Sequence, residues 1–148
     1  MIKKKFDFFV IGGGSGGVRA ARVAASKGMK VGLAEGWDLG GTCVNRGCVP
    51  KKLYSYASHI RDDFDLMDSF GWSITKKKFS WKKLVNNKKK ELSRLNGIYS
   101  SLLTNSGVKI FKSYASFVSP KLIKIGNKII YSKKFLIAVG TKPRKLDF

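Results

Sequence analysis

Two cysteines five residues apart, Cys43 and Cys48, are the side chains of this 148-residue chain whose type and spacing most directly indicate chemistry. They are too few for a disulfide-stabilised scaffold. A structural zinc site needs four ligands, whereas the chain offers these two and a lone histidine, His59. We therefore predict no metal site and favour a redox-active pair. Two unrelated buried thiols are the alternative.

The spacing of the pair requires an irregular backbone between the two cysteines. On a regular helix, residues five apart are displaced by about 140° and their Cα atoms lie beyond the roughly 7 Å that a disulfide tolerates. Gly47 supplies freedom beside Cys48, and strain in such a bridge would make it easier to reduce, which suits a catalytic disulfide. If a helix begins at Cys48, its dipole and the charges of Lys51 and Lys52 would stabilise a thiolate there.

A glycine motif upstream of the cysteines predicts a nucleotide site. Gly12, Gly14 and Gly17 follow an apolar strand over 8–11 and open a helix, so that the backbone can approach a pyrophosphate stabilised by the helix N-terminus. Glu35 lies 23 residues after Gly12, at the end of the next strand, where a carboxylate can bind ribose hydroxyls. Its charge argues against a 2′-phosphate, which favours FAD or NAD. A structural turn without a ligand is the alternative.

The apolar patterns around these residues predict the elements that position them. We expect strands at 8–11 and 31–34 with a helix between them that stops at Gly28, then an amphipathic helix over 49–67, a loop at 69–75 and a third helix over 81–105. A glycine-rich loop separates the second strand from the 49–67 helix. The first 35 residues therefore form a complete strand, helix, strand unit.

Beyond residue 108 the pattern changes to short strands. They are expected at 108–111, 115–118, 122–125, 128–131 and 135–139. Gly126 and Asn127 give a two-residue hairpin turn. We predict a small antiparallel meander that returns to a final buried strand at 135–139, ending at Gly140. The fold class is α/β, a Rossmann-like parallel sheet with helices that carries this meander.

Charge is the unusual feature of the composition, with a formal net charge of +21. Of the 30 basic residues, 24 are lysines in scattered clusters and only six are arginines. Base readout and bidentate phosphate binding favour arginine, and no known nucleic-acid module is recognisable, so we predict no specific nucleic-acid partner. No apolar run approaches the roughly 20 residues of a membrane span, and we expect neither a span nor an export signal.

Residues 6–144 resemble the N-terminal part of the FAD-dependent pyridine nucleotide-disulfide oxidoreductases, and among them the glutathione reductases. The matching segments are Val10-Ile-Gly-Gly-Gly-Ser-Gly-Gly17, Gly41-Thr-Cys-Val-Asn-Arg-Gly-Cys-Val-Pro-Lys-Lys52 and Arg94-Leu-Asn-Gly-Ile-Tyr99. The cysteine motif is highly specific for that family. The segment Val49-Pro-Lys-Lys52 resembles the matching segment of glutathione and trypanothione reductases more than that of dihydrolipoamide dehydrogenases or mercuric reductases, which have serine where Lys51 stands.

The resemblance implies a role for each site residue. Cys48 would be the thiol nearest the flavin, Cys43 the interchange thiol that attacks the disulfide substrate, and Lys51 a third catalytic residue beside the flavin. The FAD-binding residues would be Gly12, Gly14, Ser15, Gly16, Gly17, Glu35, Thr42, Cys43, Lys51, Ala115 and Gly140. Ser15, Arg22 and Tyr99 match positions that hold glutathione disulfide, although helix packing explains Tyr99 equally well.

The resemblance also implies an enzyme with more parts than residues 1–148 supply. It implies FAD as cofactor, NADPH as co-substrate, glutathione disulfide as substrate, a homodimer for the complete enzyme and a cytoplasmic location. No second glycine motif for the nicotinamide nucleotide and no dimerisation domain can be recognised, so we expect 1–148 to be the N-terminal part of an FAD-binding domain, inactive alone. A trypanothione reductase, and a noncatalytic flavin- or polyanion-binding fragment, are the alternatives.

Overall fold

The computed structural model describes residues 2–73, 75 and 78–146. Its strands are β1 (Ile2–Ile11), β2 (Val31–Glu35), β3 (Lys109–Lys112), β4 (Ala115–Ser119), β5 (Leu122–Ile125) and β6 (Lys128–Ile137). Its helices are α1 (Ser15–Ser26), α2 (Gly41–Asn45), α3 (Cys48–Leu66) and α4 (Trp81–Asn105), with a 3₁₀ turn, η1, at Asp68–Phe70. Within these residues the strands form one six-stranded sheet in the order β3-β2-β1-β6-β5-β4. The expected α/β class with helices on a Rossmann-like sheet is confirmed.

Parallel pairing brings the ends of the central strands to one edge of the sheet. β1 runs parallel to both β2 and β6, so that Ile11 lies opposite Ala34 on one side and Ile137 on the other. β3 continues the parallel part beyond β2. Because the carboxyl ends of parallel strands meet at one edge, the loops that follow β1, β2 and β6 are neighbours.

Each face of the sheet has its own core. On one face, Val10 and Leu33 pack with Val18 and Ala21 of α1 and with Leu103 near the end of α4. On the other face, Phe6, Phe9 and Ala34 meet the isoleucines of β5 and β6, Ile123, Ile125 and Ile130. The ring of Phe9 lies 5.7 Å from that of Phe111 and 6.1 Å from that of Phe135, within the range of favourable aromatic pairs. The two-sided burial explains the continuous apolar run over 8–11 at the end of β1.

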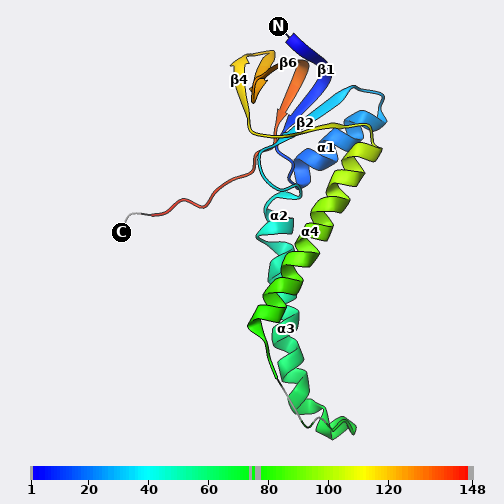
Figure 1. The fold of residues 1–148 in the computed structure, drawn as a ribbon, viewed down its shortest axis with the longest axis vertical. Coiled ribbons are helices and arrows are strands. Elements are labelled where there is room, and N and C mark those ends of the chain that lie inside the picture. The colour runs from blue at the N-terminus through cyan, green and yellow to red at the C-terminus, as the bar shows by residue number, and fades with distance from the viewer. Residues whose placement is uncertain (1, 74, 76–77, 147–148) are drawn as a thin grey trace.

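Helices α3 and α4 form a long pair that projects away from the sheet (Figure 1). At the start of α4, the ring of its first residue, Trp81, stacks on the ring of Tyr54 of α3, with centroids 5.4 Å apart and planes 12° from parallel. Further along α3, the apolar side chains Tyr56, Ile60 and Leu66 are exposed. The expected amphipathic helix is present, but the described residues cover only part of its apolar face.

Several sequence predictions differ from the structure in the strands. β1 begins at Ile2 rather than at residue 8, because its first half pairs along β6. The segment at 109–112 does not join the meander but pairs in parallel with β2. The meander itself, β4-β5-β6, is antiparallel as predicted.

The two strands expected at 128–131 and 135–139 are one continuous strand, β6. The prediction of a buried final strand was wrong: Ile137 is 64% and Val139 is 66% exposed. The strand ends at Ile137, and it extends well past the residues that pair with β5, which stop at Tyr131. In the segment expected as a loop at 69–75, residues up to Phe70 belong to η1, and Ile74 lies outside the described residues.

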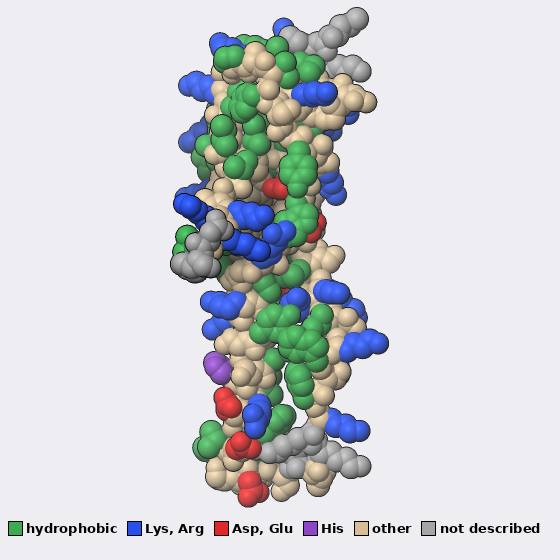
Figure 2. All heavy atoms as spheres, turned by 90° about the vertical axis from the view of Figure 1, so that its left-hand side faces the viewer, with side chains coloured by type: hydrophobic (Ala, Val, Ile, Leu, Met, Phe, Trp, Pro, Cys, Tyr) green, Lys and Arg blue, Asp and Glu red, His purple; other side chains and the backbone are tan. Residues whose placement is uncertain are grey.

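The surface charge is uneven. Lysine and arginine side chains are spread along the face drawn in Figure 2, whereas acidic side chains gather at its lower end. The last turns of α3 carry Asp62, Asp63 and Asp65, and η1 begins at Asp68. None of the helices in the described part of the chain is both long and apolar enough to cross a membrane.

Candidate cofactor and thiol site

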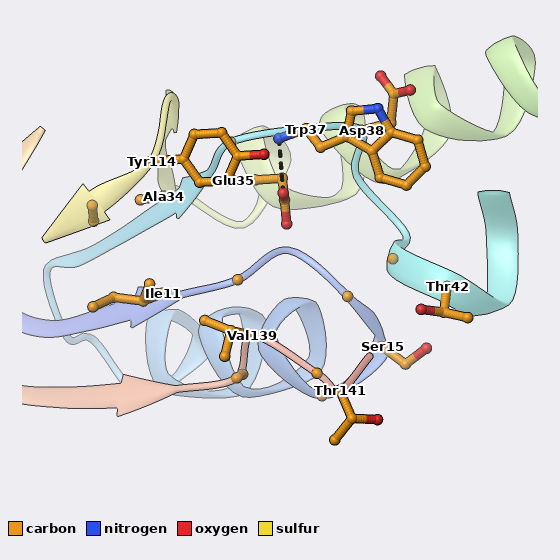
Figure 3. Close-up of a pocket in the computed structure, with 18 of the residues that line it drawn as sticks. Ile11, Ser15, Ala34, Glu35, Trp37, Asp38, Thr42, Tyr114, Val139 and Thr141 are labelled. Atoms are coloured by element: carbon orange, nitrogen blue, oxygen red, sulfur yellow. Dashed lines mark hydrogen bonds between the residues drawn. The ribbon is translucent and has the colours of Figure 1, made fainter. Parts of the chain in front are cut away.

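A cavity of about 620 Å³ opens where the carboxyl ends of β1, β2 and β6 meet (Figure 3). Its walls come from the glycine turn, the loop after β2, the start of α2, the β3–β4 connection and the segment after β6. The lining residues are Ile11, Gly12, Gly14, Ser15, Gly16, Ala34, Glu35, Gly36, Trp37, Asp38, Gly41, Thr42, Cys43, Arg46, Ser113, Tyr114, Ala115, Ala138, Val139, Gly140 and Thr141. This size and position are typical of a small-molecule site in an open α/β sheet.

The floor of the cavity is the turn from β1 into α1, and it is too tight for side chains. Gly12 has φ of +108°, and a Cβ there would overlap the carbonyl oxygen of Ala138. A Cβ on Gly17 would overlap the carbonyl oxygen of Gly12, so α1 starts directly against the turn. No side chain caps α1, and no acidic residue lies in its first turn. Its free N–H groups and dipole therefore suit an anionic group such as a phosphate.

Glu35 lies across the cavity with its carboxylate fixed by two backbone groups. Oε2 accepts a hydrogen bond from the N–H of Gly13 at 2.6 Å, and Oε1 accepts one from the N–H of Trp37 at 2.8 Å. A carboxylate oxygen accepts more than one hydrogen bond. The half-buried group can therefore still bind the hydroxyls of a sugar while holding the glycine turn.

The loop between β2 and α2 is held by a network that the sequence did not reveal. The side-chain amide of Asn45 donates to the carbonyl oxygens of Leu39 at 3.1 Å and Gly41 at 3.0 Å. Asn96 of α4 donates to the same Leu39 carbonyl at 2.7 Å and to Oδ1 of Asn45 at 2.9 Å. The N–H of Gly40 in turn donates to the carbonyl of Gly13 at 2.8 Å. Both asparagines lie inside the matched motifs, which is the signal that could have identified them.

The two cysteines lie on either side of a helix break. α2 ends at Asn45, Gly47 has φ of −126° and ψ of −107°, and α3 begins at Cys48. The predicted irregular backbone and the predicted helix start are both present. Both residues are free thiols in this structure, and their side chains are hydrogen bonded to each other. Cys43 is half-buried and lines the cavity, whereas Cys48 is exposed.

The pairing changes the acidity of Cys43. The hydrogen bond to Cys48, partial burial and the charge of Cys48 raise the pKa of the Cys43 thiol, against smaller opposing effects of the Cys48 backbone N–H and the charge of Lys51. The pairing therefore favours the protonated form of Cys43. Close thiols of this kind can form and open a disulfide by exchange. Among the described residues, no group of three or more His, Cys, Asp or Glu side chains could hold a metal ion.

The cavity brings together most of the residues that the sequence analysis assigned to a cofactor. Those lining it are Gly12, Gly14, Ser15, Gly16, Glu35, Thr42, Cys43, Ala115 and Gly140, whereas Gly17 is buried behind the turn. Cys48, expected to be the thiol nearest the flavin, and Lys51, expected beside the flavin, both lie outside the lining, so the thiol that faces the cavity is Cys43 rather than Cys48. Arg22 is exposed on α1, and Tyr99 packs against the core of the sheet. The structure adds Trp37, Arg46 and Tyr114 to the walls, which the sequence did not single out.

These features fit a dinucleotide. The uncapped helix start fits phosphates, Glu35 fits a ribose, and apolar walls from Ile11, Ala34 and Val139 fit flat ring systems. The cavity wall also contains a thiol, Cys43. A glycine turn with a purely structural role would not require a thiol there, so this favours a ligand site over a turn without a ligand.

Comparison with known proteins supports this description. Residues 6–148 match the family described as pyridine nucleotide-disulphide oxidoreductase. The chain is 46% identical over 143 residues to a glutathione reductase of Burkholderia cepacia, covering 97% of this chain and 32% of that protein. It is 41% identical over 140 residues to a glutathione reductase of Nostoc, covering 95% and 30%. It is 40% identical over 149 aligned residues to a chloroplastic/mitochondrial glutathione reductase of Pisum sativum, covering 93% and 27%. The chain thus spans about a third of the length of these relatives.

Proposed function

The chain belongs to the pyridine nucleotide-disulphide oxidoreductase family, and from that premise we propose that it forms the flavin- and disulfide-bearing part of an NADPH-dependent glutathione reductase. One observation carries the proposal: a cavity suited to a dinucleotide has in its wall a thiol, Cys43, that is hydrogen bonded to a second thiol, Cys48. A cofactor bound there would contact the sulfur of Cys43, one of two thiols that can form a disulfide with each other.

The cofactor we propose is FAD. When bound, FAD supplies a carrier that accepts hydride from NADPH and passes two electrons to a disulfide. The N–H groups at the start of α1 would hold its phosphates and Glu35 its ribose, and the backbone at Ala115 would also contact it. We assign Lys51 to a position beside the flavin, on the strength of its match to the family and of its charge acting on Cys43.

The thiols would carry the exchange with the substrate. Cys43, once its proton is removed, attacks one sulfur of glutathione disulfide, forming a mixed disulfide and releasing one glutathione as a thiolate that takes up a proton. Cys48, once its own proton is removed, then attacks the Cys43 sulfur and closes the Cys43–Cys48 disulfide, and the second glutathione leaves as a thiolate that takes up a proton. Because the hydrogen bond with Cys48 raises the pKa of Cys43, the first step needs a base to remove the proton from Cys43.

Glutathione disulfide is the proposed substrate because it is anionic. We assign Ser15, Arg22 and Tyr99 to its binding, since an arginine suits the carboxylates of the peptide. A trypanothione reductase is the alternative, and the strongly basic surface of this chain favours the anionic glutathione over a positively charged conjugate.

The complete reaction needs more than these residues. We propose that the NADPH site and a dimerisation region, neither of which we assign within 1–148, are required for turnover. We also propose that the complete enzyme is a homodimer working in the cytoplasm, where glutathione and thioredoxin keep thiols reduced. These residues alone, mixed with FAD, NADPH and glutathione disulfide, should leave the NADPH absorbance unchanged. Steady oxidation that depends on Cys43 would contradict this assignment.

Stoichiometric exchange tests the thiol chemistry directly. The reduced chain should convert glutathione disulfide to glutathione and form a disulfide between Cys43 and Cys48, as judged by mass spectrometry of proteolytic fragments. Cys48→Ala should stop at a glutathionyl group on Cys43. A wild-type chain that carries separate glutathionyl groups on both cysteines would contradict the exchange pair.

Binding measurements test the cofactor. Titration with FAD should give saturable binding, whereas duplex DNA should bind weakly at low salt and lose that binding as the salt concentration rises. DNA binding without FAD binding would favour a polyanion-binding fragment instead.

A further inference from the structure

Arg46 lies in the turn between the two cysteines, yet its side chain faces the cavity. It follows the last residue of α2, and its backbone N–H donates to the carbonyl oxygen of Thr42 at 2.9 Å. Its guanidinium carbon lies 3.8 Å from the centre of the Trp37 ring, and both side chains line the cavity. The charges that act on the pKa of Cys43 are those of Cys48 and Lys51. Arg46 is thus directed toward the cofactor side of the turn rather than toward the sulfurs.

The indole ring of Trp37 is the surface on which the guanidinium of Arg46 stacks. The backbone N–H of Trp37 donates to Oε1 of Glu35 at 2.8 Å, which anchors the backbone beside the cavity, and the residue lines the cavity while 46% exposed (Figure 3). A guanidinium stacked on an indole keeps its N–H groups free at its edge, in a planar fork that matches phosphate oxygens. The stack therefore restricts Arg46 without using the donors that would bind an anion.

The charge of the cavity needs such a cation. Its lining contains two carboxylates, Glu35 and Asp38, and the sole Lys or Arg among these lining residues, all of which the structure describes, is Arg46. A dinucleotide brings a diphosphate with two further negative charges. The start of α1 offsets these with only about half an elementary charge. Without Arg46, the diphosphate would face two carboxylates with no full positive charge in the lining.

We propose that Arg46, held by stacking on Trp37, is a diphosphate-binding residue of the cofactor site. The inference rests on the dinucleotide binding proposed above and adds a specificity: Arg46 should favour ligands that carry a diphosphate over the same nucleoside without it. Trp37 acts as a positioning residue, because it orients the guanidinium.

The test compares ADP with adenosine as ligands of the 148-residue chain, with dissociation constants from calorimetry. Arg46→Gln should weaken ADP binding about tenfold to a hundredfold, the effect of losing a hydrogen bond between charged partners, and should change adenosine binding less than twofold. The salt dependence of ADP binding should also flatten. Arg61→Gln, which removes a cation from α3 outside the cavity lining, is the matched control and should leave both affinities unchanged.

Two variants of Trp37 separate the effect of positioning the Arg46 side chain from the effect of its charge. Trp37→Phe keeps an aromatic face and should retain most of the preference for ADP, whereas Trp37→Leu should lose much of it although Arg46 is still present. Circular dichroism shows whether each variant is folded.

The outcomes distinguish this inference from the proposed function. A wild-type chain that binds neither ADP nor FAD would overturn the proposed function. If the wild-type chain binds both ADP and FAD and Arg46→Gln binds ADP equally well, the role of Arg46 is overturned while the proposed function stands. Equal losses for ADP and adenosine would also overturn the role of Arg46, because they would indicate a general disturbance of the cavity.

Discussion

Two neighbouring glycines in the first turn of α1 should respond in opposite directions to the same substitution. A Cβ on Gly17 would overlap the carbonyl oxygen of Gly12 and lie 3.0 Å from its carbonyl carbon and 3.2 Å from Cγ1 of Val10. A Cβ on Gly16 would have no heavy atom within 4 Å. Both positions are helical, and neither has a positive φ. The two variants therefore differ mainly in the close contact between α1 and the glycine turn.

The expected magnitudes follow from this geometry. Overpacking costs about 1–3 kcal/mol, and the upper end applies because the obstacles for Gly17→Ala are backbone atoms. Alanine gains up to ~1 kcal/mol over glycine in a helix, so the net loss for Gly17→Ala should be about 2 kcal/mol. Gly16→Ala should instead stabilise the chain by about 0.5–1 kcal/mol. The two variants should therefore differ by about 3 kcal/mol in the free energy of unfolding.

Urea unfolding followed by circular dichroism measures this difference. With a denaturant dependence of about 2 kcal/mol per molar urea, the unfolding midpoints should be separated by about 1.5 M. Unfolding midpoints that rise equally in both variants would refute the close approach of α1 to Gly12. The conclusion that the start of α1 lies directly against the glycine turn would then fail as well.

Three further predictions concern the network, the thiols and an ion pair. Asn96→Leu removes hydrogen bonds to the half-buried loop at Leu39, so urea unfolding should show a loss of about 1–3 kcal/mol that Asn87→Leu, exposed on the same helix, does not. Cys48→Ala removes the hydrogen bond that raises the pKa of Cys43, so alkylation of Cys43 should set in at lower pH; an unchanged pH profile would contradict the pairing. The ion pair of Asp7 with Lys133 at 2.7 Å lowers the pKa of the Asp7 carboxyl. The pair therefore stabilises the folded chain fully above the ordinary carboxyl pKa, and this contribution is lost as the pH falls through the lowered pKa. The difference in urea midpoint between wild type and Asp7→Asn should shrink over that range, and a constant difference would count against the pair.

The parts of the site that follow from local chain chemistry could be predicted from the sequence. The strand before Gly12, the helix after it and the carboxylate at Glu35 form one continuous unit, and the parallel register of β1 and β2 then brings Glu35 to the glycine turn. The helix start at Cys48 follows from Gly47 in the same way. The glycine turn and the helix start at Cys48 each lie within a few residues of their structural reason, whereas Glu35 is brought to the turn by the pairing of two strands of the same unit.

The parts that depend on distant partners could not be predicted. Asn96 bonds a loop 57 residues away. Its place in a matched motif marks the residue, but the helical pattern around it gives no sign of which loop it bonds. Ser132, Lys133 and Lys134 interrupt an apolar pattern and so indicated a break between two strands. In the structure the hydroxyl of Ser132 donates to the carbonyl of Lys134 at 2.8 Å, and Lys133 pairs with Asp7 of β1, so the strand continues through them.

The cofactor cavity and the thiol pair share one framework, so neither can change shape alone. Gly13 is held on both sides, since its N–H donates to Glu35 and its carbonyl accepts from Gly40. Gly40 directly precedes α2, which carries Cys43, and Asn45 ties the end of α2 back to the same loop. Because these bonds together form a chain from the nucleotide side to the sulfur side, with the Gly40–Gly13 bond as the link, a change at the glycine turn should alter the reactivity of Cys43 even though it touches neither cysteine. Gly17→Ala should therefore shift the alkylation rate of Cys43, whereas Gly16→Ala should leave it as in the wild-type chain.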